Sequence, residues 1–404
     1  MRPSFAPRFF ERLSPYLPAR RAVAVTLPLC GLIVAGLIWR ETGFEGFSAG
    51  LLLALLPVPF LLGALRWVDA QAPKPWRALA FAFGWGACAA TLFALVTNGL
   101  LVRLLTDEAA TIAPTHADTL ELTVIAPVVE ESSKAVAVLL LFLRRPHAFH
   151  GILAGIVTAG VTATGFAFTE NILYLGSAFT QDRAAGLGGV DLLGSRTAVT
   201  FFIRVVLAPA AHPVFTALTG VGFGLAAVLA RDRRRARGLL PLAGLAAAMG
   251  LHSAWNASAS MDVFGVCLVY GLVMIPVFCL LCWLATWTRR RQLRVVEEML
   301  PLYVASGWLT AAELPALVSP RRRSLSRRLA RKEHGYAGWR AVADYQAAAT
   351  SLALLREQAE RKAAGPDFAA RERELLDRVR RHRKLAGPPT IAAARSDLGF
   401  AIAG

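Results

Sequence analysis

The stretch that decides the fold runs from Val128 to Val136 and reads Val-Val-Glu-Glu-Ser-Ser-Lys-Ala-Val. Glu130, Glu131 and Lys134 stand here inside an otherwise apolar segment that is long enough to cross a bilayer. On membrane-insertion scales, an unpaired charge at the centre of such a segment costs at least ~2.5 kcal/mol. The cluster therefore predicts either a buried ion pair or a functional site.

The composition predicts an all-α polytopic membrane protein. Fifty-five per cent of the 404 residues are hydrophobic, and they gather in long blocks that a soluble domain does not have. We expect about eight transmembrane helices, at about residues 22–39, 47–66, 78–102, 120–143, 151–176, 197–229, 239–258 and 263–287. Pro209 and Pro213 predict a kink or break in the sixth segment. Small-residue pairs such as Gly151/Gly155 and Gly220/Gly224 predict helix-packing faces.

Lysine and arginine residues in the connecting segments predict the orientation in the membrane. Fifteen lie in the N-terminal segment and the even-numbered loops, and only four lie in the odd-numbered loops. By the positive-inside rule, we expect a multi-pass protein of the cell inner (plasma) membrane with both termini in the cytoplasm. The predicted parts are a cytoplasmic N-terminus (1–21), an eight-helix transmembrane domain (22–288, with its motifs at 120–260) and a basic cytoplasmic tail (289–404).

The predicted tail holds 23 basic and 12 acidic residues of a chain whose net charge is +17. Pro301, Pro320, Gly365-Pro366 and Gly387-Pro388-Pro389 predict that it is cut into short helices. The runs 347–364 and 368–384 are typical of charged helices that bind anionic lipid or a protein partner. A loosely structured solubilising tail is the alternative. Because the positive charge lies in loops and tail, no nucleic-acid partner is expected.

Four of the eight predicted spans carry polar groups that membrane helices usually exclude. In chain order these groups are Glu130, Glu131 and Lys134, then Glu170 and Asn171, then Arg204 and His212, then His252 and Asn256. Lys134 follows the two glutamates by four and three residues, so it can neutralise one of them within its own helix. Arg204 can hold a carboxylate from another helix. Counted along the helices, Glu130, Glu170, His212 and His252 fall ~20 to ~28 Å from the cytoplasmic ends, toward the outer face.

Two carboxylates and two histidines at one depth suit a zinc site. Imidazole nitrogens and carboxylate oxygens are zinc ligands, and a catalytic zinc takes three protein ligands and a water. A remaining carboxylate can take a proton from that water, and an amide such as that of Asn256 can stabilise an oxyanion. The HExxH pattern of soluble zinc proteases is absent.

The order of these residues resembles the PrsW family of intramembrane proteases, relatives of the type II CAAX prenyl endopeptidases. The resemblance rests on Glu130-Glu131-x-x-Lys134, Phe166-x-x-x-Glu170, His212 and His252-x-x-Trp255-Asn256, which together cover about residues 120–260. It implies a multi-spanning α-helical metalloprotease that cuts a membrane-embedded protein substrate, with an anti-sigma factor as the best-known example. It also implies that Glu130 is the catalytic carboxylate and that Glu170, His212 and His252 complete the site.

We therefore predict an intramembrane endopeptidase that acts in the lipid bilayer near the outer leaflet. Its catalytic residues are predicted to be Glu130, Glu131 and Asn256, and Glu170, His212 and His252 are predicted to bind Zn²⁺. Glu131 is also explained by a structural ion pair with Lys134 or Arg204. Two other functions fit the same residues: a transporter that relays protons or cations through the Glu and His groups, and a scaffold whose tail recruits a partner.

Overall fold

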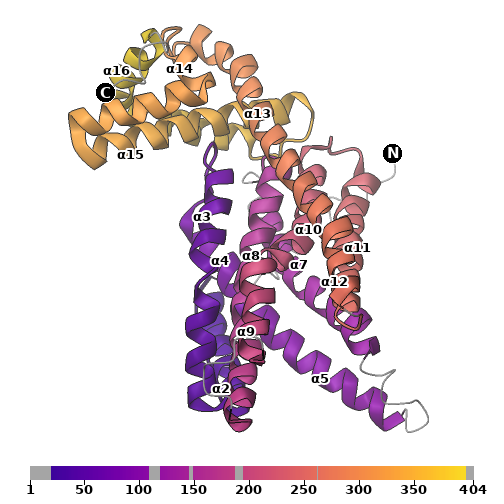
Figure 1. Ribbon diagram of the computed structural model, residues 1–404. Coiled ribbons are helices and arrows are strands. Elements are labelled where there is room, and N and C mark those ends of the chain that lie inside the picture. The colour runs from indigo at the N-terminus through magenta and orange to yellow at the C-terminus, as the bar shows by residue number, and fades with distance from the viewer. Residues whose placement is uncertain (1–19, 109–118, 145–148, 187–193, 262, 397–404) are drawn as a thin grey trace, which may run out of the picture. The chain divides into compact units, whose positions relative to one another are not determined.

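The computed structural model describes residues 20–108, 119–144, 149–186, 194–261 and 263–396, and every regular element in these ranges is a helix (Figure 1). The predicted all-α class is confirmed. The predicted N-terminal segment 1–21 lies almost wholly outside the described residues.

The chain divides into two compact units. Unit 1 consists of Met1–Trp67, Lys74–Ala226 and Arg234–Trp283, and unit 2 of Val68–Pro73, Ala227–Arg233 and Leu284–Gly404. Unit 1 contains all the residues predicted for the site. Unit 2 contains the basic C-terminal residues together with two short connections between helices of unit 1.

Unit 1 is a helical bundle in which several helices run on into short π-helical turns. Its first half comprises α2 (Arg20–Leu55), α3 (Val58–Val68), α4 (Trp76–Gly84), η2 (Trp85–Ala90) and α5 (Thr91–Glu108). It continues with η3 (Glu121–Ile125), α7 (Ala126–Arg144), α8 (Ile152–Ala184), α9 (Arg196–Phe201), η5 (Phe202–Leu207), α10 (Ala211–Val228) and α11 (Arg234–Ser258). The last elements are α12 (Val263–Val269), η6 (Tyr270–Met274) and α13 (Ile275–Ala305), and the boundary between the units falls within α13.

Six helical stretches of the described chain are long and apolar enough to cross a membrane, so the predicted count of eight is not confirmed. The stretch Arg21–Val68 contains two of the predicted spans. The chain turns sharply inside it at Gly43, which has a φ of 69°. The rings of Trp39 and Phe47 consequently lie 6.3 Å apart, whereas eight residues of straight helix would separate them by ~12 Å. The predicted span 120–143 is not among the six, because the charges of α7 lower its hydropathy.

The helix α8 forms the centre of unit 1. It packs against α2, α4, η2, α7 and α9, and 89% of its most apolar window is buried. Glycines allow this close packing: a Cβ added at Gly86 would collide with the carbonyl of Thr162, and one at Gly155 would collide with the carbonyl of Gly220. The predicted packing role of the small residues in 151–155 and 220–224 is confirmed. Glu170, one of the predicted site residues, therefore lies on the most deeply buried of the six membrane-length stretches.

The predicted break in the sixth segment is also confirmed. Helical hydrogen bonding stops after Leu207, Ala208 adopts φ −127° and ψ 44°, and a new helix starts at Ala211. Pro209 lies at this break. Proline cannot donate a backbone hydrogen bond, so the helix cannot continue through it without losing one. The break places His212 in the first turn of α10.

Unit 2 is a helical domain with its own apolar core. Its elements are the C-terminal part of α13, α14 (Leu314–Val318), α15 (Pro320–Glu360) and α16 (Phe368–Arg395). Fully buried side chains such as Leu300, Leu317, Val342, Leu352 and Val379 form the core.

The predicted short helices of this region are only partly correct. Pro320 begins α15, and Gly365-Pro366 separates α15 from α16. Pro301, Pro388 and Pro389 lie inside helices, so the predicted breaks there are wrong. Each proline removes one helical hydrogen bond, but Leu300, Pro389 and Thr390 beside them are buried, and this packing keeps the helices continuous.

Candidate active site

Helices that are distant in the sequence bring the predicted polar residues together in unit 1. Each comes from one of five elements: Glu130, Glu131 and Lys134 from α7, Glu170 from α8, Arg204 from η5, His212 from α10 and His252 from α11. None of these side chains is exposed to solvent. The helices α7 and α11 carry their polar groups on the side that faces the bundle, and their apolar residues cover the rest.

Lys134 lies at the middle of the cluster. Its Nζ is 2.8 Å from Glu131 Oε1, 3.3 Å from Glu130 Oε2 and 3.1 Å from Nδ1 of His212. The same ammonium lies over the ring of Phe166, 4.0 Å from its centroid. The ion pair predicted within α7 is therefore present, but the lysine binds both glutamates and reaches a second helix.

Glu131 is fixed by three partners and orients His252. Its Oε1 accepts from Lys134 and lies 3.2 Å from Nδ1 of His252, and its Oε2 accepts a 2.8 Å hydrogen bond from Thr216. The Nδ1–H of His252 is the donor in this arrangement, which directs its Nε2 lone pair toward Glu130, 3.9 Å from Oε2. The ring of His252 also stacks on Phe215 at 4.7 Å.

Glu170 has the same relation to the second histidine. Its Oε2 lies 2.7 Å from Nε2 of His212 and 3.0 Å from the guanidinium of Arg204. The Nε2–H of His212 donates to this carboxylate, so the Nδ1 lone pair faces Lys134. Arg204 also donates to Asn171 and covers the ring of Tyr174 at 3.5 Å.

Each histidine is therefore paired with its own carboxylate. Nε2 of His252 faces Glu130, and Nδ1 of His212 accepts from Lys134, which also binds Glu130. Ligand atoms of Glu130, His212 and His252 lie within 4.8 Å of one another, and all three groups are buried. Two imidazoles and one carboxylate form a ligand set found in catalytic zinc sites. In such sites the histidine commonly donates its other ring N–H to a carboxylate, which fixes the orientation and the tautomer of the ring.

The structure brings together five of the six predicted site residues. Glu130 occupies the position beside both histidines where a ligand is expected, and Glu170 lies behind His212. The sixth, Asn256, is half-buried, and its Nδ2 donates a 2.9 Å hydrogen bond to the carbonyl of Leu122 in η3. This contact ties α11 to the turn that precedes α7.

Two contributors to the site were not predicted from the sequence. Thr216 lies four residues after His212 on α10, so the helical period could have suggested it, but threonine is common in apolar helices. Phe215 stacks on His252 from another helix, and no sequence signal identifies such a contact. Arg204 was considered as a partner for Glu131, whereas it binds Glu170.

A buried centre of carboxylates and imidazoles inside a bundle of membrane-length helices is typical of membrane proteins that bind a metal ion or transfer protons within the bilayer. Comparison with known families narrows this class. The sequence matches the PrsW family of intramembrane metalloproteases over residues 74–281, just over half of the chain.

The chain belongs to this family, and it is therefore a peptidase of the membrane. The matched range includes every residue of the cluster around Lys134. The predicted family and enzyme class are confirmed. Searches of curated proteins and of solved structures returned no match.

Proposed function

We propose that the protein hydrolyses a peptide bond of a membrane-embedded protein, near the outer leaflet, at the centre formed by Glu130, His212 and His252. The observation that carries this proposal is the convergence of three buried ligand atoms within 4.8 Å. A transporter that relays protons would instead place its groups in a row along a path. An anti-sigma factor is the substrate that the resemblance to the family suggests.

The donor set fits a divalent metal ion, for which we propose Zn²⁺. Each imidazole has one nitrogen bonded to a carboxylate, as is usual for a metal-ligating histidine. The other nitrogen faces Glu130 in His252 and the ammonium of Lys134 in His212. When bound, a zinc ion would polarise the scissile carbonyl and acidify a water molecule. Lys134 hydrogen-bonds to Glu130 and His212, two of the three ligand groups, so it competes for the same lone pairs.

The surrounding residues have positioning roles in this proposal. Glu131 holds His252, and Glu170 holds His212, each through one hydrogen bond. Lys134 and Arg204 balance the three carboxylates. In this proposal Glu130 is a ligand instead of the catalytic carboxylate, and Glu170 supports a ligand instead of binding the metal, so both roles differ from those expected from the sequence. Asn256 positions η3, and its predicted oxyanion role would require its bond to Leu122 to break.

For the orientation we propose cytoplasmic termini in the inner membrane. The distribution of basic residues supports this proposal, and so does the set of segments that make up unit 2. The connections Val68–Pro73 and Ala227–Arg233 belong to the same compact unit as the C-terminal residues, so the three lie on one side of the bilayer. The exposed arginines of α15 and α16 are then available to anionic lipid or to a protein partner at the cytoplasmic surface.

Comparing membranes from cells that carry either the wild type or Glu130→Gln tests the proposal. Full-length substrates should accumulate in the variant, and their shorter products should appear only with the wild type. Reconstituting the purified protein with each candidate substrate in lipid vesicles identifies direct cleavage. If a candidate is cut equally by both proteins, Glu130 has no part in the reaction and the proposed centre is wrong.

A further inference from the structure

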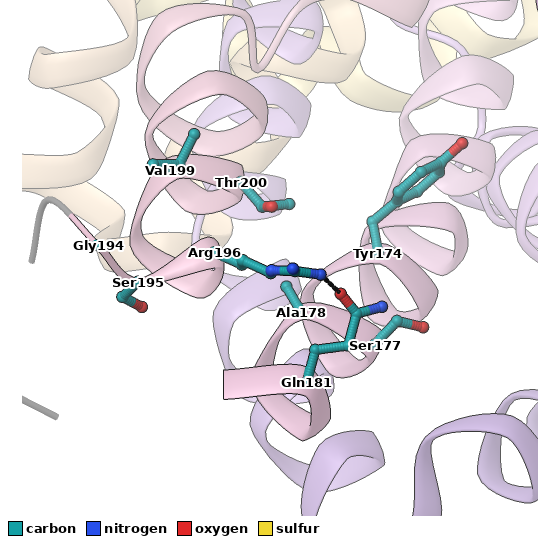
Figure 2. A pocket seen from close by; sticks show the side chains of 9 residues that line it. All are labelled: Tyr174, Ser177, Ala178, Gln181, Gly194, Ser195, Arg196, Val199 and Thr200. Atoms are coloured by element: carbon teal, nitrogen blue, oxygen red, sulfur yellow. Dashed lines mark hydrogen bonds between the residues drawn. The ribbon is translucent and has the colours of Figure 1, made fainter. Parts of the chain in front are cut away.

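A cavity of about 400 Å³ opens between the C-terminal part of α8 and the start of α9, in unit 1. Figure 2 shows Tyr174 on one side, Gly194 and Ser195 on the opposite side, and Arg196 with Gln181 between them. Two candidate spans, Ile152–Ala184 and Arg196–Val228, end and begin beside this cavity. It therefore lies where a polypeptide would leave the apolar part of the bilayer.

Among the described residues that line the cavity, Arg196 carries the one positive charge and none has a carboxylate. The guanidinium of Arg196 donates to the amide oxygen of Gln181, a neutral group (Figure 2). Asp182, which is close in sequence, is not available to Arg196's side chain. Its carboxylate accepts instead from Ser195, Thr197 and the backbone N–H of Arg196, and so caps α9. Within the described residues, the guanidinium forms no ion pair.

Tyr174 connects the lining of the cavity to the candidate active site. The ring of Tyr174 lies under the guanidinium of Arg204, 3.5 Å away, and Arg204 binds Glu170. Along α8, Tyr174, Ala178 and Gln181 follow Glu170 at helical spacing and so continue one face of the helix away from the site. A substrate chain that reaches the site along this face would pass through the cavity.

We propose that this cavity binds the substrate in an extended conformation on one side of the scissile bond, and that Arg196 recognises an acidic side chain there. The inference deepens the proposed function and depends on it. Eleven helical residues separate Glu170 from Gln181, which corresponds to ~16 Å. An extended chain of about five residues spans this length. The acidic residue should therefore lie about five residues from the cleaved bond.

The lining chemistry favours a peptide over a lipid headgroup. The hydroxyls of Ser177 and Thr200 and the amide of Gln181 can pair with backbone groups of an extended chain. Headgroup sites usually gather several basic residues, whereas this cavity has one. A single arginine matches a single carboxylate, which it can bind with two parallel hydrogen bonds.

Binding of single-span probe peptides tests this inference. Each probe has about 20 apolar residues followed by a flexible polar segment, with one Glu, Gln or Lys at successive positions. Affinities are measured by fluorescence anisotropy with full-length protein in neutral lipid nanodiscs, for the wild type, Arg196→Gln and Arg183→Gln. Arg183 is the matched control, because it is an exposed arginine at the end of α8 that pairs with Glu45 and does not line the cavity.

The wild type should bind the best-placed Glu probe about threefold more tightly than the Gln probe, as for a partly exposed ion pair. Arg196→Gln should abolish this preference, and Arg183→Gln should keep it. The fold of α9 should survive, because Asp182 caps the helix through the backbone of Arg196. Equal affinities for the Glu and Gln probes in the wild type would overturn the inference, and so would a preference that persists in Arg196→Gln.

Cross-linking supplies a second measurement that does not depend on charge. Thr200→Cys should form a disulfide with a probe cysteine placed at the position where the Glu probe binds best, and Ser260→Cys should not. Cross-linking at both sites, or loss of the Thr200→Cys product when anionic lipid is added, would show that the cavity is not a peptide site. Cleavage of the natural substrate tests the proposed function separately. Normal cleavage without a charge preference refutes only the role of Arg196.

Discussion

Both units bury charged side chains, and Arg323 in unit 2 and the cluster on α7 in unit 1 are satisfied in different ways. In unit 2 the guanidinium of Arg323 is fully buried and meets only neutral oxygens. It donates to the carbonyls of Leu317, Gln346 and Gln71 and to the hydroxyl of Thr350. In unit 1 the buried charges of α7 meet other ionisable groups, including two histidines on other helices.

Glu313, a buried carboxylate of unit 2, is held mainly by neutral donors. Glu313 accepts hydrogen bonds from the backbone and hydroxyl of Thr310 and from the hydroxyl of Tyr345, and Arg383 lies 3.5 Å away. These partners satisfy the carboxylate completely and leave no lone pair directed at a shared point. A buried charge that only supports the fold is thus solvated by fixed groups, whereas the cluster in unit 1 retains lone pairs that converge.

Among variants that test this difference between the units, Glu130→Gln should have the largest effect. The amide keeps the shape of the side chain but is a poor metal ligand, so both bound metal and cleavage should be lost, with the rate falling about a thousandfold or more. Metal content of the purified protein and cleavage of the substrate in vesicles measure the two effects. Glu45→Gln, on an exposed glutamate, is the control. If the variant keeps its metal but loses activity, Glu130 accepts a proton and is not a ligand.

Most of the residues in the site could be predicted from the sequence, because charges in an apolar helix are costly and therefore conspicuous. The pairing of Lys134 with the glutamates of its own helix follows from their spacing. The roles that we propose for Glu130 and Glu170 differ from those expected and could not be predicted, because they depend on how α7 and α8 are rotated against α10. Helical spacing fixes which residues share a face, but it does not fix which face meets which neighbour.

The number of spans and the core of unit 2 were harder to predict for related reasons. The first two predicted spans form one continuous helical stretch that turns at Gly43, so length does not count them separately. The charges of α7 lower its hydropathy, so hydropathy does not identify it as a span. In unit 2, Arg323 is one of three consecutive arginines, and nothing in the run 321–323 distinguishes the buried one from the exposed Arg321. The kink of α15 at His334 and Gly335 decides this, because it brings Gln346 and Thr350 of the same helix onto Arg323.

The next largest effect is expected from Glu170→Gln. If Glu170 orients His212 from behind, the variant should keep the metal site but bind the metal about 10- to 100-fold more weakly. A competition titration with a zinc-chelating dye measures this affinity. Asn171→Ala is the neighbouring control, because Asn171 contacts Arg204 but no histidine in the described structure. Complete loss of metal would instead make Glu170 a ligand, as the sequence had suggested.

A smaller effect, on stability alone, is expected from Arg323→Met in unit 2. Burial, with a lesser contribution from Arg327, lowers the pKa of Arg323 to about 9, so its charge is held only by its four acceptors. Methionine fills the space but leaves these oxygens without a donor, which should cost about 2 kcal/mol. Thermal unfolding of the full-length protein in detergent should show the loss, and Arg321→Met should not. Metal content should stay unchanged, and a parallel loss of metal would mean that the contrast between the units does not hold.

The smallest effect should come from Tyr345→Phe, which removes the hydroxyl that donates a 2.8 Å hydrogen bond to Glu313. The loss should be about 1.5 kcal/mol, because the acceptor is charged and buried, and Tyr336→Phe on an exposed tyrosine should have no effect. Burial and the charge of Glu313 raise the pKa of Tyr345 above its ordinary value of 10.0. The folded state therefore holds the phenol proton more tightly than the unfolded state, and this contribution to stability is complete below pH 10 and decreases above it. Unfolding measured from pH 8 to pH 11 should thus show a weaker alkaline loss in Tyr345→Phe than in the wild type. An equal loss in both proteins would mean that Tyr345 and Glu313 are not coupled.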